Sequence, residues 1–372
     1  MNLVSKEKFM GLRLFNLLII TLGVFYASIN YAASEPIEPI RPPKLIDIGM
    51  VELGKKLFYD RRLSLSGNFS CNSCHNLSLG GVDNQQYSVG HRWERLRINT
   101  PTVLNSSLNV AQFWDGRAST LQAQASGSLE NSSGMALSHS IAVNVVKTIP
   151  GYVAEFKSVF DEEVITLEMI TASIAEFEKT LVTPGSKFDR WLLGDKSAIS
   201  QYELSGYQLF KQVGCAGCHN GAGVGGKVFK KLGVFETYET SHPSRGRADI
   251  SGKQEDENVF KVPLLRNIEL TYPYFHDGAI DKLDEAVNIM ARVQLGVTLR
   301  EDETARIVAF LKTLTGKQPT FSLPRLPASG PDTPRPQPFL TFNENAWFKK
   351  YWSPEKVLLR GKAILSGQAH HL

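Results

Sequence analysis

The chain has 372 residues, of which 42% are hydrophobic and 21% are charged, so most of it should be globular rather than disordered. This length is enough for two domains of ordinary size. The formal net charge of +4 is too weak to predict nucleic acid or an anionic membrane surface as a partner.

The first 33 residues have the composition of a secretory signal. Basic residues come first, an apolar run over residues 14–29 follows, and small residues end at Ala33. The run is close to the shortest length that spans a membrane, and Tyr31 weakens the cleavage signal. We therefore expect a cleaved signal peptide or an uncleaved N-terminal anchor, with the folded part outside the cytoplasm in either case.

The next part of the chain is expected to contain helices separated by long loops. A proline-rich lead-in over residues 34–48 precedes a short helix predicted at residues 49–58. Residues 79–120 are rich in Gly, Asn and Ser and are predicted to form loops, which at this length often carry function. Helical periodicity returns at residues 167–181 and stops before Pro184, where we place a domain boundary.

The rest of the chain follows a similar order. Ser200 and Glu203 form a capping-box pattern that predicts another helix. Further helices are expected at residues 284–293 and after Thr298 and Glu301, which are predicted to cap a helix ending before Gly316. The predicted domains therefore cover residues 49–184 and 185–317, and residues 318–372 form a proline-rich linker and a tail to which no function is assigned.

All four cysteines belong to two CxxCH motifs, Cys71-Asn-Ser-Cys74-His75 and Cys215-Ala-Gly-Cys218-His219. In such a motif the two thiols can form thioethers with the haem vinyl groups, and the adjacent His can reach the iron as an axial ligand. The sequence therefore predicts two covalently attached haem c groups.

Zinc and disulfides are the alternatives for these cysteines. Zinc ribbons place their CxxC pairs about 15–20 residues apart, whereas these motifs begin at positions 71 and 215. A disulfide framework, which export would permit, does not require a His after both pairs. Haem thus explains more of the pattern than either alternative.

A weak internal repeat surrounds the motifs. The segment Gly54-Lys-Lys-Leu-Phe58 precedes the first motif, and Gly206-Tyr-Gln-Leu-Phe210 precedes the second. Each motif is also followed by Asn. A duplicated, mostly helical module accounts for this arrangement.

The sequence resembles the bacterial dihaem cytochrome c peroxidases between residues 53 and 316. Six segments besides the haem motifs carry the resemblance in order: residues 53–60, Gly90-His91, 99–105, 111–117, 263–267 and 273–278. The resemblance implies an all-α fold of two cytochrome-c-like domains, each with one haem. It also implies a periplasmic homodimer that reduces hydrogen peroxide with electrons from a small soluble donor, a cytochrome c or a cupredoxin.

The resemblance also implies roles for single residues. His75 would be the proximal ligand of a low-potential haem where peroxide reacts, and His91 the distal ligand that leaves on activation. His219 and Met290 would be the axial pair of a high-potential haem, and Trp114 would assist electron transfer between the two. A calcium ion would be held by Asn99, Thr271 and Pro273, in keeping with its preference for oxygen ligands. His276 is expected to form a hydrogen bond near the second haem, with no catalytic role.

One position departs from the family pattern. Family members place a Gln and a Glu beside the peroxide, and the Gln is present as Gln124. The Glu position, just before Met135, is Gly134, and Glu130 could substitute only if the loop folds differently. Two other functions therefore remain open: a dihaem oxidase that modifies a protein partner through a high-valent iron state, and a non-catalytic electron carrier. A Tyr ligand would favour the oxidase, so Met290 favours the peroxidase.

Overall fold

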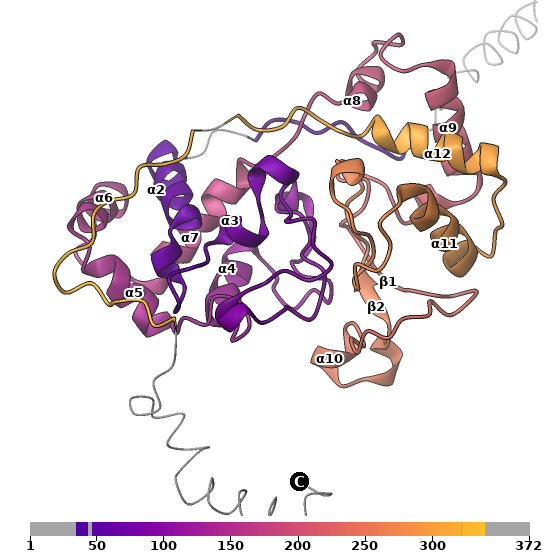
Figure 1. Cartoon of the computed structure of the whole chain (residues 1–372). Helices are drawn as coiled ribbons and strands as arrows, with labels where there is room; N and C mark the ends of the chain where they lie inside the picture. The colour runs from indigo at the N-terminus through magenta and orange to yellow at the C-terminus, as the bar shows by residue number, and fades with distance from the viewer. Residues whose placement is uncertain (1–34, 44–46, 321, 339–372) are drawn as a thin grey trace, which may run out of the picture. The chain divides into compact units, whose positions relative to one another are not determined.

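The computed structural model describes residues 35–43, 47–320 and 322–338 (Figure 1). The predicted signal or anchor and the tail from residue 339 onward lie outside the described residues. No helix in the described part of the chain is long and apolar enough to cross a membrane. All the elements named below belong to one compact unit that starts at Ile37.

The fold is mostly helical, as predicted, with one small antiparallel sheet (Figure 1). The helices that follow the lead-in are α2 (Ile48–Tyr59), α3 (Cys71–Cys74), α4 (Leu121–Glu130), α5 (His139–Lys147), α6 (Pro150–Phe160) and α7 (Leu167–Lys179). The later elements are α8 (Lys187–Leu192), α9 (Gln201–Gln212), β1 (Phe229–Lys231), α10 (Ala248–Ser251), β2 (Val259–Lys261), α11 (Leu283–Leu295) and α12 (Glu301–Lys312).

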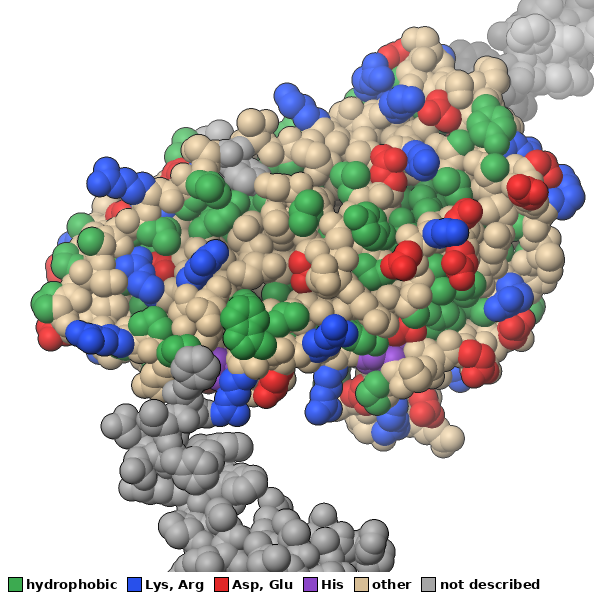
Figure 2. All heavy atoms as spheres, in the orientation of Figure 1, with side chains coloured by type: hydrophobic (Ala, Val, Ile, Leu, Met, Phe, Trp, Pro, Cys, Tyr) green, Lys and Arg blue, Asp and Glu red, His purple; other side chains and the backbone are tan. Residues whose placement is uncertain are grey.

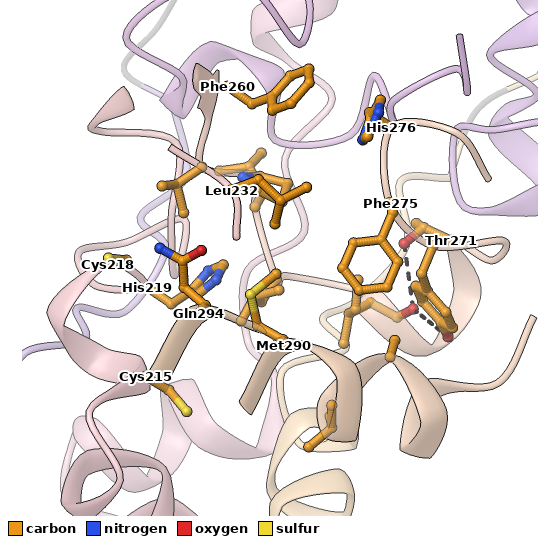
Figure 3. Close-up of a pocket in the computed structure, with 18 of the residues that line it drawn as sticks. Cys215, Cys218, His219, Leu232, Phe260, Thr271, Phe275, His276, Met290 and Gln294 are labelled. Carbon is orange, nitrogen blue, oxygen red and sulfur yellow. Dashed lines mark hydrogen bonds between the residues drawn. The ribbon is translucent and has the colours of Figure 1, made fainter. Parts of the chain in front are cut away.

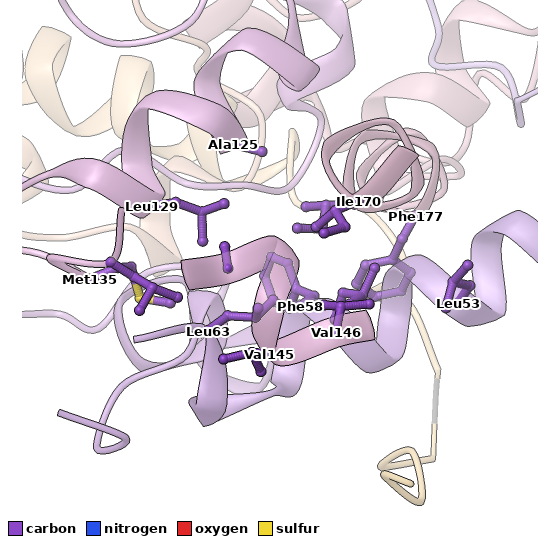
Figure 4. Packing of buried hydrophobic residues seen from close by; sticks show 14 of the residues in the cluster. Leu53, Phe58, Leu63, Ala125, Leu129, Met135, Val145, Val146, Ile170 and Phe177 are labelled. Atoms are coloured by element: carbon purple, nitrogen blue, oxygen red, sulfur yellow. The ribbon is translucent and has the colours of Figure 1, made fainter. Parts of the chain in front are cut away.

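Two separate hydrophobic clusters form the interior. The first is built by α2, α4, α5 and α7, and Figure 4 shows Phe58 of α2 beside Phe177 of α7. The second is built mainly by α8, α9 and α12, where Phe188, Tyr207 and Phe310 are fully buried. Each cluster surrounds one pair of long helices, so each half of the chain can bury its own core.

The internal repeat marks the crossing of those helix pairs. A Cβ atom on Gly54 of α2 would lie 1.8 Å from the carbonyl oxygen of Ser173 in α7. A Cβ atom on Gly206 of α9 would lie at the same distance, 1.8 Å, from the carbonyl oxygen of Arg306 in α12. The repeated glycine is therefore required because the two helix backbones touch there.

The structure corrects part of the predicted helix map. Helices α4, α5 and α6 were not predicted, and α6 begins at a proline, Pro150, in its first turn. The predicted Thr298–Glu301 cap is wrong: α12 starts after Arg300, whose backbone N–H donates to Glu303 Oε2 at 2.9 Å. The capping box of α9 is confirmed, since the backbone N–H groups of Ser200 and Glu203 each bond to the other's side chain.

Two extended segments pack against the helices. The lead-in buries Ile37 and Ile40, and Ile37 belongs to the second hydrophobic cluster. After residue 321 the chain runs back past α6 and α5 of the first half (Figure 1), where Gln337 N–H donates to Leu65 O at 2.6 Å. We call residues 322–338 the strap.

Each extended segment is held by an arginine that also binds a buried aspartate. Arg266 lies 2.8 Å from Asp189 and donates to Glu38 O in the lead-in at 2.8 Å. Arg62 lies 2.6 Å from Asp60 and donates to Pro327 O in the strap at 2.9 Å. Both aspartates are 1% exposed, so each ion pair replaces lost hydration with direct contacts.

Candidate functional site

The second CxxCH motif forms a tight turn at the edge of a cavity (Figure 3). Gly214, with φ 101°, leads into the 3-10 turn Cys215–Gly217, and His219 N–H donates to Cys215 O at 3.0 Å. His219 Nδ1 lies 3.3 Å from Val224 O, which leaves Nε2 for the cavity side. A hydrogen bond of this kind orients an imidazole that serves as a metal ligand.

Met290 reaches the same cavity from α11. Figure 3 shows its thioether and the His219 ring extending into one space, with Cys215 and Cys218 at the side. The space between protein atoms is about 1720 Å³, part of it open to solvent, and most of its lining is apolar. Two thiols, an imidazole and a thioether around one apolar cavity are the groups that a covalently bound haem with a His/Met axial pair requires. The residues present therefore fit the group.

The first motif is built in a similar way on α3. Ser70 N–H donates to Ser73 Oγ at 2.9 Å, and His75 N–H donates to Cys71 O at 2.9 Å. His75 Nδ1 is buried and has no hydrogen-bond partner within the described residues. Burial lowers the pKa of His75, so its ring is neutral and able to bind a metal.

The cysteines do not fit the two alternative uses. No disulfide joins any two of the four, and they form no cluster of three or more His, Cys, Asp or Glu side chains that could hold zinc in the part of the chain described. Burial raises the pKa of Cys71 and Cys215 to about 12 and that of Cys74 to about 11. Burial thus disfavours a free thiolate at these three cysteines.

His91 lies at the tip of a short turned loop. Leu96 N–H donates to Ser88 O at 2.8 Å, which closes the loop, and His91 starts the 3-10 turn His91–Trp93. The His91 side chain is only 4% exposed, yet neither ring nitrogen has a hydrogen-bond partner in the described chain. Burial lowers its pKa. A buried, unpaired imidazole is costly, and bonding to a metal would remove that cost.

The loop that carries Gly134 packs directly on the His91 loop. His91 N–H donates to Gly134 O at 2.8 Å, and a Cβ atom on Gly90 would lie 2.1 Å from Ser133 O. A Cβ atom on Gly134 itself would lie 3.3 Å or more from its neighbours, the first being atoms of Asn131. A side chain at position 134 can thus be accommodated with a shift of a few tenths of an ångström.

The polar groups expected near the peroxide site are arranged as follows. Gln124 is half-buried on α4, and its Nε2 donates to Ser128 Oγ at 2.9 Å. Glu130 is exposed and lies 3.4 Å from His139 Nδ1, so it is engaged away from Gly134. Glu94, which was missed at the level of sequence, accepts a hydrogen bond from Ser133 Oγ at 3.2 Å. No sequence motif identifies Glu94, because the contact depends on the pairing of the two loops.

Trp114 is fixed between the two halves of the chain. Its Nε1 donates to Asn99 O at 2.9 Å, and its carbonyl oxygen accepts from Lys261 N–H at 2.8 Å. The ring lines the cavity of the second motif and meets the His276 ring edge-on at 6.4 Å. His276 is buried and stacks on Phe260.

The three residues expected to bind calcium all line the cavity of the second motif. Asn99 is 7% exposed, and its Nδ2 donates to Gln85 O and Gln86 O. Thr271 and Pro273 flank Tyr272, and the Tyr272–Pro273 peptide bond is cis. The structure therefore brings the three residues to one place, although they come from segments far apart in the sequence.

Lys261 and Glu178 are among the buried charged residues that the sequence analysis missed. Lys261 of β2 is 5% exposed and lines the cavity, and Glu178 of α7 is 4% exposed. Lys261 gives no sequence signal beyond standing just before Pro263. Glu178 could have been found by aligning the repeated helices, because Phe177-Glu178 occupies the place of Phe310-Leu311.

Two protein-family models match successive parts of the chain. A model of the di-haem cytochrome c peroxidase family matches residues 49–197, and a cytochrome c model matches residues 204–315. The cytochrome c551 peroxidase of Nitrosomonas europaea is 57% identical over 87% of this chain and 97% of its own length. That of Pseudomonas aeruginosa is 44% identical over 77% and 84%.

More distant relatives share the fold. The methylamine utilization protein MauG of Methylorubrum extorquens is 36% identical over 78% of this chain and 83% of its own. The crystal structure of a MauG-like protein associated with microbial copper homeostasis superposes with a TM-score of 0.66. It is 26% identical and covers 78% of this chain and 96% of that one.

Proposed function

Because the chain belongs to the di-haem cytochrome c peroxidase family and carries two haem c groups, we propose that it reduces hydrogen peroxide to water with electrons from a small donor protein. A cytochrome c or a cupredoxin is the expected donor. The balanced reaction consumes one peroxide, two electrons and two protons and releases two water molecules. The observation that carries the proposal is that His219 and Met290 line one cavity in the second half, whereas the first half has the buried, unpaired His91 among the described residues.

His219 and Met290 would be the axial pair of the second-half haem, whereas His91, the proposed distal ligand of the first, lies on a strained loop. Arg92 and Trp93 follow His91 with φ values of 59° and 62°. Non-glycine residues in this region cost on the order of 1–3 kcal/mol each and occur where a segment changes conformation. The bound haems supply the electron exchange and the site of peroxide reduction. Departure of His91 would relieve this strain and admit peroxide.

Electrons would enter at the half that holds His219 and Met290 and pass by Trp114 to the half that holds His75. Trp114 is suited to this position because hydrogen bonds at its indole Nε1 and at its carbonyl oxygen hold it in place. A fixed aromatic ring between the haems keeps the distance for electron transfer constant. His276, edge-on to Trp114, would support the ring rather than react.

Proton transfer is the weakest part of the site. A positioned acid or base contributes about 10²–10⁴-fold to a rate, and Gly134 supplies none. Gln124 can orient peroxide by hydrogen bonding but cannot move its proton. Glu94 presents a carboxylate to the Gly134 loop and is our candidate for the proton carrier.

Two variants at position 134 test whether the missing carboxylate limits proton transfer to the peroxide. Gly134→Glu should raise peroxide turnover by about 10²-fold or more, whereas Gly134→Gln, of equal size but unable to carry the proton, should not. Turnover is measured as oxidation of a reduced donor cytochrome after each addition of peroxide. Equal rates in both variants and the parent would show that position 134 does not limit turnover.

The function itself is tested by following the visible spectrum through stepwise reduction, with and without calcium, before peroxide is added. We expect the first-half haem to change ligation after one electron and peroxide then to be consumed with two donor molecules oxidised. Retention of His91 after reduction, without turnover, would instead support an electron carrier. Oxidation of a protein partner in place of the donor would support the oxidase.

Several finer assignments belong to the same proposal. Asn99, Thr271 and Pro273 would hold calcium, and the fact that all three line one cavity supports this. The signal-like N-terminus supports export to the periplasm, with a possible inner-membrane tether. On the face shown in Figure 2, acidic and basic side chains are interspersed, which suits a protein partner better than nucleic acid. A homodimer is proposed from the family alone.

A further inference from the structure

We propose that Lys261 binds a propionate carboxylate of the second-half haem and thereby raises the reduction potential of that haem. The inference rests on haem binding, which the proposed function also requires, but not on peroxide reduction.

Lys261 is a buried cation without a buried anion. Its side chain is 5% exposed, and its Nζ donates to Asn109 Oδ1 at 3.2 Å. No ion pair joins it to a carboxylate of the described residues, and burial lowers its pKa to about 8. Buried ammonium groups are normally paired, because the loss of hydration is otherwise uncompensated. The structure therefore has a place for an anion beside Lys261.

A second buried cation in the same half of the chain has the partners that Lys261 lacks. Arg266 is equally buried, but it pairs with Asp189 and makes three further hydrogen bonds. Compared with Arg266, Lys261 has only a neutral amide oxygen within reach. The missing partner must therefore come from outside the described protein atoms.

The haem supplies a suitable anion at this place. Lys261 lines the cavity that also contains Cys215, Cys218, His219 and Met290. Thioether bonds hold the vinyl side of a haem c at the cysteines, so its two propionates extend to another part of the same cavity. They are the only carboxylates that a haem carries, and one of them would give Lys261 a charge-assisted hydrogen bond.

Lys261 also stands at a point of contact between the two halves. Asn109, which accepts the hydrogen bond from the Lys261 ammonium, belongs to the first half, and the next residue, Val110, donates its N–H to Gly226 O. Lys261 N–H itself donates to Trp114 O at 2.8 Å. Lys261 would thus contact the propionate through its side chain and Trp114, the aromatic residue between the haems, through its backbone. The same positive charge disfavours the more positively charged oxidised iron, which raises the reduction potential.

The test uses the full chain with both haems attached. Lys261→Met removes the charge and keeps the length of the side chain, and Lys261→Arg keeps the charge. Lys230→Met is the matched control, because Lys230 lines the same cavity but is exposed. We expect Lys261→Met to lower the midpoint potential of the second-half haem and to shift the propionate bending bands in its resonance Raman spectrum. Lys261→Arg and Lys230→Met should leave both close to the parent.

Unchanged potential and unchanged propionate bands in Lys261→Met would overturn the proposal. So would an equal shift in Lys230→Met, because the effect would then reflect net charge rather than a contact. If Lys261→Met gives no folded protein, Lys261→Gln is measured in its place, since it can keep the contact with Asn109. Neither readout requires peroxide turnover, so a protein that binds both haems and fails as a peroxidase still decides the question.

Discussion

At the place where the second half of the chain has Leu311, the first half has Glu178. Both follow a buried phenylalanine in the last turn of the long helix, Phe177 or Phe310, which packs on the repeated glycine. Leu311 lines the cavity of the second motif. Glu178 is buried with an oxygen, Oε2, that has no hydrogen-bond partner in the described residues, and its charge acts on Cys71. Equivalent positions of the repeated helices therefore carry an apolar side chain, Leu311, in the second half and a proton-binding side chain, Glu178, in the first.

The two halves differ also in how firmly they hold an extended segment. The Arg266 side chain is 0% exposed, whereas that of Arg62 is 19% exposed. Both bind a buried aspartate and a backbone carbonyl of a distant segment. The comparison indicates that the lead-in is an integral part of the second half, and that the strap is bound to the first half by contacts partly open to water.

Replacing each of the two arginines singly should give the largest change in the free energy of unfolding, and the two changes should differ between the halves. Arg266→Ala leaves Asp189 buried without its cation, which we expect to lower the free energy of unfolding by about 3–5 kcal/mol. Arg62→Ala should cost clearly less, because water reaches its site and Tyr152 OH still donates to Asp60 at 2.8 Å. Denaturant unfolding of each haem-loaded variant measures the difference. A loss for Arg62→Ala as large as that for Arg266→Ala would contradict the comparison.

The repeated glycines test whether the halves are equivalent at the helix crossing. Gly54→Ala and Gly206→Ala each place a Cβ atom 1.8 Å from a facing carbonyl oxygen, so the helices must separate. We expect each to lower stability by about 3 kcal/mol, as overpacked cores do, and by similar amounts. Gly127→Ala is the control, because nothing lies within 4 Å of its Cβ position in α4. That variant should gain about 0.5–1 kcal/mol from helix propensity.

Glu178 should produce the smallest effect, and one that depends on pH. Burial raises its pKa from 4.5 to about 8, so the folded state binds a proton that the unfolded state has lost between these values. Its contribution to stability is present in full below pH 4.5 and is lost as pH rises through about 8. Glu178→Leu, which copies Leu311, should remove this decline, so its stability relative to the parent should increase as pH rises from 4.5 towards 8. Leu311→Met is the control, and parallel stability–pH curves for Glu178→Leu and the parent would refute the assignment.

Much of the site could be predicted because it depends on short spacings. The CxxCH motifs place two thiols and an imidazole in one turn whatever the surrounding fold, and the repeat around Gly54 and Gly206 predicted a duplicated helical module. The Ser200–Glu203 capping box is equally local and is confirmed. Helices α4, α5 and α6 were missed because polar and small residues interrupt their apolar pattern, as in Leu121–Glu130.

The sequence by itself determined the two haem attachment sites, their histidines and the duplicated helical plan, because each is encoded by residues close together along the chain. Only the tertiary structure decided which charges are buried and what they meet. No motif in the sequence distinguishes Lys261 and Glu178 from ordinary surface residues. The contact between Glu130 and His139 likewise depends on the fold. The lead-in and the strap resemble linkers in the sequence, yet a backbone carbonyl of each accepts a hydrogen bond from an arginine that is paired with a buried aspartate. Such pairings depend on the path of the whole chain, so no local pattern can encode them.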